Sequence, residues 1–127
     1  VEHLVFGMHA YLDFMLAHPN WMRIHLYAHP WGLGPTSGAQ LQSDAWQAGM
    51  DLHTSVLAQA MQDGAVLASD PKLLARSLAA IQQVHLADWV THGMKSPPHQ
   101  VRETIIDLFC QSFLTDAGRR RIQEQRP

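Results

Sequence analysis

The sequence predicts an all-α protein, an antiparallel bundle of about five main helices in one domain. Apolar residues recur every three or four positions along most of the 127 residues, which is the spacing of a helix face. No stretch alternates regularly between apolar and polar residues, as a half-buried strand would. Glycine and proline fall between the periodic segments, where they are expected to end one helix and begin the next.

The composition fits a single globular domain covering residues 1–127 and excludes several other classes of protein. Apolar residues make up 46% of the chain and charged residues 16%, and 127 residues suffice for one hydrophobic core. The formal charge of −2 provides no basic face for nucleic acid, and no apolar run approaches the roughly 18 residues of a membrane span. The single cysteine, Cys110, cannot form an internal disulfide, which suits the reducing cytoplasm. We therefore expect a cytoplasmic protein that does not enter a membrane.

Three helices are expected in the first half of the chain, at residues 1–17, 20–30 and 37–63. Pro19 ends the first and Pro30 the second, because a residue that precedes proline is pushed out of the helical conformation. Ser37 is a suitable N-cap for the third helix, and Gly64 follows its last residue. The segment 31–35 between the second and third helices is expected to be a turn or hinge.

Two long helices are expected in the second half, at residues 70–93 and 96–114, followed by a short polar tail. Both begin with a capping side chain and then proline at the first helical position, as Asp70-Pro71 and Ser96-Pro97. Both carry apolar residues around most of their circumference, which a single small domain cannot easily cover.

The two-sided character of these last helices predicts a dimer. Each chain would add a helical hairpin to a four-helix bundle between two copies. Central helices of a monomeric bundle are the alternative interpretation of the same pattern. The residues expected at the dimer interface are Ala79, Leu86, Val90, Ile106, Phe109 and Phe113.

The short second helix places two histidines on an apolar face. His25 and His29 are four residues apart, so both imidazoles project from one side of a helix. Such a pair can bind a metal ion, but the site then needs one or two further ligands, for which His53 or His85 would be available. The methionine and tryptophan neighbours of the pair favour a pocket wall or a packed core over a metal site.

Methionine and aromatic residues also recur on the inward faces of the first, third and fourth helices. Methionine is polarizable and adapts its shape, so such faces suit an apolar pocket, although ordinary core packing is the alternative for any single residue. With isolated polar side chains as anchors, the expected ligand is a hydrophobic or aromatic small molecule. The candidate ligand-binding residues are Met8, Tyr11, Met15, Trp21, Met22, His25, His29, Trp46, Met50, His53, His85 and Trp89.

Catalytic patterns are weak, so we do not expect an enzyme or a bound cofactor. His85, Asp88 and His92 are spaced as helical neighbours, and a catalytic His-Asp pair is conceivable there. A hydrogen bond between helices, or an interaction at a helix end, explains the same spacing more simply. The sequence contains no nucleophile elbow, no phosphate-binding loop and no His-Glu-x-x-His motif.

Two stretches carry a resemblance to a known family. The segment GAVLASDPKLLAR, residues 64–76, leads into a long helix that contains Trp89. The chain opens with an apolar helix, then His18-Pro19, then a short helix rich in large side chains. In helix order and length, over nearly the whole chain, these features resemble the C-terminal regulatory domain of tetracycline-repressor (TetR) family transcriptional regulators.

The resemblance implies an effector-binding and dimerisation domain whose last two long helices form the dimer bundle. In that family a helix-turn-helix precedes this region, and the sequence contains no counterpart of it. DNA binding is therefore expected only through a missing N-terminal domain, under allosteric control by the ligand. Two alternatives remain: a metal- or haem-binding helical protein that uses His25, His29 and a third histidine, and a helical interaction module without a small ligand.

Overall fold

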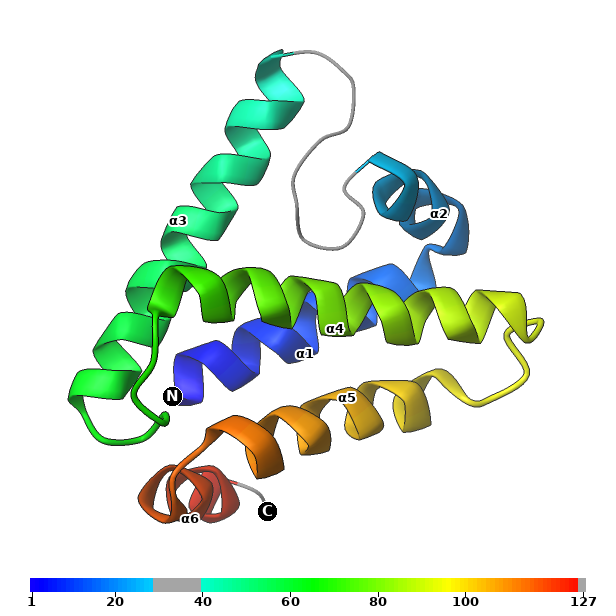
Figure 1. The fold of residues 1–127 in the computed structure, drawn as a ribbon. Coiled ribbons are helices and arrows are strands. Elements are labelled where there is room, and N and C mark those ends of the chain that lie inside the picture. The colour runs from blue at the N-terminus through cyan, green and yellow to red at the C-terminus, as the bar shows by residue number, and fades with distance from the viewer. Residues whose placement is uncertain (29–39, 126–127) are drawn as a thin grey trace.

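The structure, a computed structural model, describes residues 1–28 and 40–125, without the side chains of 25–28, 40–43 and 45. It confirms the prediction of an all-α fold (Figure 1). In the described part of the chain, β-structure is limited to an isolated antiparallel bridge between Val66 and Leu114. The helices are α1 (Glu2–Ala17), α2 (Pro19–Ala28), α3 (Gln40–Gln62), α4 (Pro71–Thr91), α5 (Pro98–Phe113) and α6 (Asp116–Gln125).

The helices α4 and α5 run antiparallel beside each other, and α1 and α3 cover them (Figure 1). The helix α1 packs mainly against α5, and α3 packs mainly against α4. The side chains that are at most 1% exposed come from all four of these helices, so one core holds them together. Each such side chain contributes about 1.5–3 kcal/mol by leaving water. The largest side chains in this core include Leu12, Leu57, Leu86, Ile105, Ile106 and Phe109.

The start and the end of α4 follow the sequence signals closely. Asp70 caps the helix, because its carboxylate accepts hydrogen bonds from the backbone N–H groups of Lys72 and Leu73 at 3.0 and 3.3 Å. Pro71 occupies the first helical position, as predicted. Past the other end, Gly93 has a φ of +74°, a left-handed conformation that glycine adopts without strain.

Other boundaries differ from the predictions. The helix α5 begins at Pro98 with Pro97 at the N-cap position, and no side chain caps it. The sequence instead suggests Ser96 as the cap, but the Ser96 carbonyl accepts a 2.9 Å hydrogen bond from the indole Nε1 of Trp89. The short helix α2 begins at Pro19. Its predicted end at Pro30, the turn at 31–35 and the capping role of Ser37 lie outside the described residues.

The polar tail expected after the fifth helix is a sixth helix, α6. Its sequence is predominantly polar and only 10 residues long, so its helical state depends on contacts with the rest of the fold. Ile122 is buried, and Gly118 is buried close to the backbone of Ala65. The guanidinium of Arg121 donates two hydrogen bonds of 2.8 Å to the carboxylate of Glu2 on α1. These hydrogen bonds from Arg121 lower the pKa of Glu2 to about 2.

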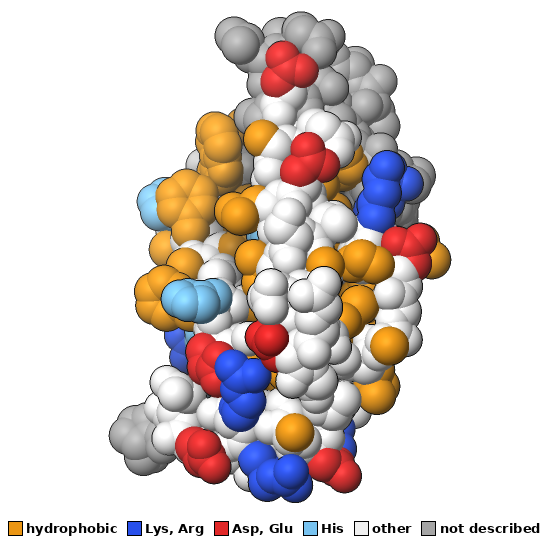
Figure 2. All heavy atoms as spheres, turned by 90° about the vertical axis from the view of Figure 1, so that its left-hand side faces the viewer, with side chains coloured by type: hydrophobic (Ala, Val, Ile, Leu, Met, Phe, Trp, Pro, Cys, Tyr) orange, Lys and Arg blue, Asp and Glu red, His pale blue; other side chains and the backbone are white. Residues whose placement is uncertain are grey.

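Hydrophobic side chains are also found on the outside of the molecule. On the side that carries α3, they lie on both flanks of a polar column (Figure 2). In the described part of the chain, no helix combines the length and apolar character that a bilayer span would need. The most exposed large hydrophobic side chains are Phe6, Ile24, Leu52 and Leu73, each more than 60% exposed.

Candidate ligand-binding site

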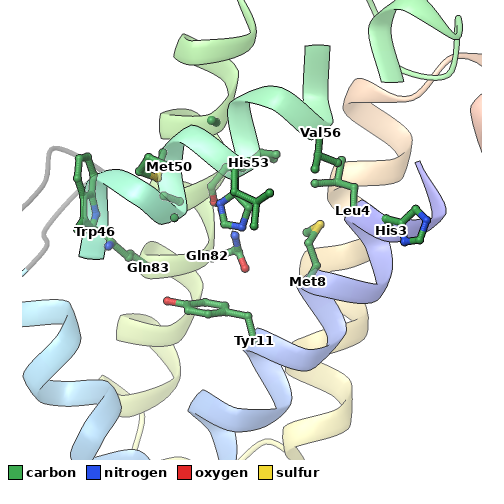
Figure 3. Close-up of a pocket in the computed structure, with 16 residues that line it drawn as sticks. His3, Leu4, Met8, Tyr11, Trp46, Met50, His53, Val56, Gln82 and Gln83 are labelled. Atoms are coloured by element: carbon green, nitrogen blue, oxygen red, sulfur yellow. The ribbon is translucent and has the colours of Figure 1, made fainter. Parts of the chain in front are cut away.

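A pocket of about 500 Å³ lies between α1, α3 and α4. This volume falls in the range of sites for drug-sized ligands. Figure 3 shows side chains from all three helices pointing into the same space. The lining consists of His3, Leu4, Gly7, Met8 and Tyr11 from α1, Trp46, Gly49, Met50, Leu52, His53 and Val56 from α3, and Ala75, Leu78, Ala79, Gln82 and Gln83 from α4.

Five of the candidate residues from the sequence meet in this pocket. Met8 and Tyr11 face it from α1, while Trp46, Met50 and His53 face it from α3 (Figure 3). Residues three or four positions apart on a helix share a face, so each helix presents its set in one direction. The two helices cross so that these faces oppose each other across the pocket.

The pocket presents polar groups but no charged side chain from Lys, Arg, Asp or Glu among its described lining residues. Burial raises the pKa of Tyr11 to about 12, so its hydroxyl stays protonated at neutral pH. Burial also lowers the pKa of His53 below its ordinary value of 6.5, which favours the neutral imidazole. His53 is still reached by solvent, because its side of the pocket is open. The site is therefore suited to an uncharged ligand.

Gln82 and Gln83 are two of the lining residues that were not among the candidates from the sequence. Their polarity suggests a solvated position in the middle of α4, yet they are 9% and 5% exposed. The signal for burial was present in the spacing. Leu78 and Leu86, one turn before and one turn after Gln82, are both buried, so Gln82 lies on the inward face of its helix.

The remaining candidate ligand-binding residues do not line this pocket. Met15 and Met22 are buried in the core, and Trp21 is 54% exposed. The side chains of His25 and His29 lie outside the described residues.

His85 and Trp89 line a second cavity of about 430 Å³ between α4 and α5, most of whose lining residues are polar. The Nδ1 atom of His85 is 2.9 Å from the carbonyl oxygen of Ile81, and His92 Nδ1 is 3.3 Å from Asp88 Oδ1. The His85 contact lies within α4, and the contact of His92 with Asp88 lies at the end of that helix. Across the described residues, no group of three or more His, Cys, Asp or Glu could hold a metal ion. The metal- or haem-binding alternative therefore has no support.

Several residues predicted at the dimer interface are covered within a single chain. Leu86 and Ile106 are 0% exposed and Phe109 is 1% exposed, so they have no surface left for a partner. Packing of α1 on α5 and of α3 on α4 covers the apolar faces that the sequence suggested were directed outward. Ala79 lines the pocket instead. The other two predicted interface residues, Val90 and Phe113, are partly buried against the core.

The outward face of the α4–α5 hairpin carries different apolar side chains. Val84 on α4 is 44% exposed and Leu108 on α5 is 38% exposed. Val84 lies one turn before Asp88, and Leu108 lies one turn after Thr104. Asp88 and Thr104 both line the cavity between the two helices, so all four positions belong to the face around that cavity.

A comparison with protein families identifies the kind of domain. No curated protein and no solved structure matches the chain. A family model described as "Tetracyclin repressor-like, C-terminal domain" matches residues 1–117, which include α1 to α5 and the start of α6. Domains of this family serve in general as ligand-binding and dimerisation domains of regulators. The chain therefore belongs to the family of tetracyclin repressor-like C-terminal domains.

Proposed function

We propose that this chain is the effector-sensing domain of a transcriptional regulator and binds a neutral hydrophobic or aromatic small molecule. The observation that carries the proposal is the pocket of about 500 Å³ between α1, α3 and α4, whose described lining lacks Lys, Arg, Asp and Glu. Methionine and aromatic side chains on two facing helices supply adaptable apolar contacts for such a ligand. Domains of this family are typically not enzymes, and the proposal assigns no catalytic residue.

The proposal includes dimerisation and control of DNA binding in the cytoplasm. The helix α4 contributes one side to the pocket, through Ala79 and Gln82, and another side to the outward face, through Val84. A ligand that binds two positions of α4 with different affinity would shift the balance between two arrangements of a dimer. A DNA-binding domain outside this chain would convert that shift into a change of operator affinity.

A pocket-filling substitution tests the ligand site. A side-chain carbon placed at Gly49 on α3 meets no atom of the described residues within 4 Å. Gly49→Leu should therefore fold, and its side chain should fill part of the pocket. Isothermal titration with 4-phenylphenol and 4-methylbiphenyl, two neutral aromatic probes, should show binding to the unchanged protein. We expect Gly49→Leu to weaken both affinities at least tenfold.

The matched control is Ala48→Leu, which adds the same side chain at the preceding, solvent-exposed position of α3. It should leave both affinities within twofold of the unchanged protein. Equal binding by the two variants would show that the probes bind elsewhere, and the proposed ligand site would then be wrong.

A further inference from the structure

Gln82 carries an unpartnered hydrogen-bond acceptor inside the pocket. The residue is 9% exposed, and its Oε1 atom is buried and has no hydrogen-bond partner among the residues that the structure describes. Figure 3 shows its amide near the centre of the pocket, between His53 and the side chains of Tyr11 and Met8. Buried side-chain oxygens in proteins are almost always hydrogen-bonded, so this exception indicates a missing partner.

The orientation of this amide is determined by its other end. The Nε2 atom of Gln82 donates a 3.2 Å hydrogen bond to the carbonyl oxygen of Leu78, one turn earlier on α4. If the amide were turned over, two oxygens would face each other there and repel. The N–H end is therefore held by the helix, and the carbonyl end is left to the pocket.

We infer that the ligand of this pocket is a neutral aromatic molecule with a hydroxyl group, which donates a hydrogen bond to Gln82 Oε1. This inference rests on the proposed function and specifies its ligand class. A donated hydrogen bond would satisfy the buried acceptor, whereas a purely apolar ligand would leave it unsatisfied.

The rest of the pocket selects against charged ligands. Among the described lining residues there is no Lys or Arg to pair with a carboxylate and no Asp or Glu to pair with an ammonium group. A charged ligand would lose its hydration without an opposite charge in return. The rings of Trp46 and Tyr11 and the sulfur atoms of Met8 and Met50 border the same space and favour an aromatic body, through ring and sulfur contacts (Figure 3).

A matched set of probes tests the inference by isothermal titration. The probes are 4-phenylphenol, 4-methylbiphenyl and biphenyl-4-carboxylate, which present a hydroxyl, a methyl and a carboxylate on one aromatic body. The unchanged protein should bind 4-phenylphenol at least tenfold more tightly than either of the others. In Gln82→Met, which keeps the length of the side chain but removes the acceptor, the preference for 4-phenylphenol over 4-methylbiphenyl should disappear.

The control variant is Gln83→Met, the same replacement at the next position of α4, which should keep the preference. If the unchanged protein binds the hydroxyl and methyl probes equally, or if Gln82→Met retains the preference, the inference is wrong while the proposed function stands. If neither neutral probe binds, both the proposed function and this inference fail.

A second measurement does not depend on any ligand. Since Gln82 Oε1 is buried without a partner, Gln82→Met should raise the melting temperature of the ligand-free protein by about 3 °C or more. Gln83→Met should not raise it. An unchanged or lower melting temperature for Gln82→Met would show that a water molecule or a rearranged side chain already satisfies the acceptor, and would overturn the inference.

Discussion

Gly118 lies where α6 passes the backbone of Ala65, and the absence of a side chain makes this approach possible. A side-chain carbon placed there would collide with the carbonyl oxygen and carbon of Ala65. The same carbonyl oxygen accepts a 2.9 Å hydrogen bond from the backbone N–H of Thr115, so the loop before α4 is held against the start of α6. Because backbone atoms cannot turn away as a side chain can, the position tolerates only glycine.

This contact predicts the effect of a single methyl group. Gly118→Ala should lower the free energy of unfolding by about 2 kcal/mol or more, measured by urea denaturation. Gly7→Ala is the control, since the added carbon meets nothing within 4 Å and alanine favours a helix by about 0.5–1 kcal/mol. An unchanged free energy of unfolding in Gly118→Ala would mean that α6 can shift away from Ala65.

Single residues also show where the pattern in the sequence failed. Met8 and His53 were expected in a pocket and line one. Gln82 was not among the candidate ligand-binding residues, because polarity usually indicates exposure and nothing in one chain's sequence shows which polar residue faces a cavity. The buried neighbours of Gln82 at four-residue spacing were the available signal.

At the level of the elements, α1 and α6 are joined by the pair of Glu2 and Arg121. The two hydrogen bonds of 2.8 Å connect the first and the last helix of the described chain. The side chain of Glu2 is 31% exposed and that of Arg121 is 40% exposed. Solvent therefore screens the interaction, and its contribution to the stability of the fold is modest.

The pair predicts a dependence of stability on pH. The pKa of Glu2 is about 2 in the folded protein and ordinarily 4.5, so the unfolded chain binds more protons between these values. The stabilisation by Glu2 is therefore complete above about pH 4.5 and is lost as the pH falls towards 2. In Glu2→Gln, the free energy of unfolding should fall less steeply over this interval than in the unchanged protein.

Denaturation in urea at several pH values measures this difference, at low and at high salt. Glu124→Gln is the control, because Glu124 is an exposed carboxylate on α6. Identical slopes for Glu2→Gln and the unchanged protein would show that the pair does not stabilise the fold.

Some helix boundaries follow local signals in the sequence, and others depend on contacts with distant residues. Asp70 and Pro71 are local signals, and they mark the start of α4 correctly because a cap and a proline act within one turn. The predicted start of α5 differs from the observed one by one or two residues, because Pro97 and not Ser96 occupies the N-cap position. The helix α6 was missed because its stability depends on Glu2 and Ala65, which lie far away in sequence.

At the level of the whole molecule, the proposed dimer requires a face that one chain leaves open. Val84 on α4 and Leu108 on α5 are exposed, and each lies one turn from a residue that lines the cavity between the two helices. Two copies of this hairpin could form a four-helix bundle through these positions.

The double substitution Val84→Glu and Leu108→Glu should convert a dimer into monomers, because it places four carboxylates in one interface. Light scattering after size exclusion should show half the mass, with an unchanged helical circular dichroism spectrum. Leu67→Glu is the control, since Leu67 is 51% exposed in the loop before α4 and lies on neither helix of the hairpin. A dimer that survives the double substitution would show that this face is not the interface.

Leu86→Glu should instead unfold the protein, because Leu86 is 0% exposed in one chain.

The sequence by itself determined the helical class, the order of the main helices and the residues that face inward on α1. Those properties depend on neighbours within a few residues, and apolar spacing, caps and prolines report them directly. Only the tertiary structure decided that Met8, Trp46 and Gln82 border one cavity, that Ile106 is core and not interface, and that the ten residues of α6 are helical. The physical reason is that a helix has one inward pattern whether it meets a neighbouring helix, a cavity or a second chain. Which of these it meets depends on how the helices cross.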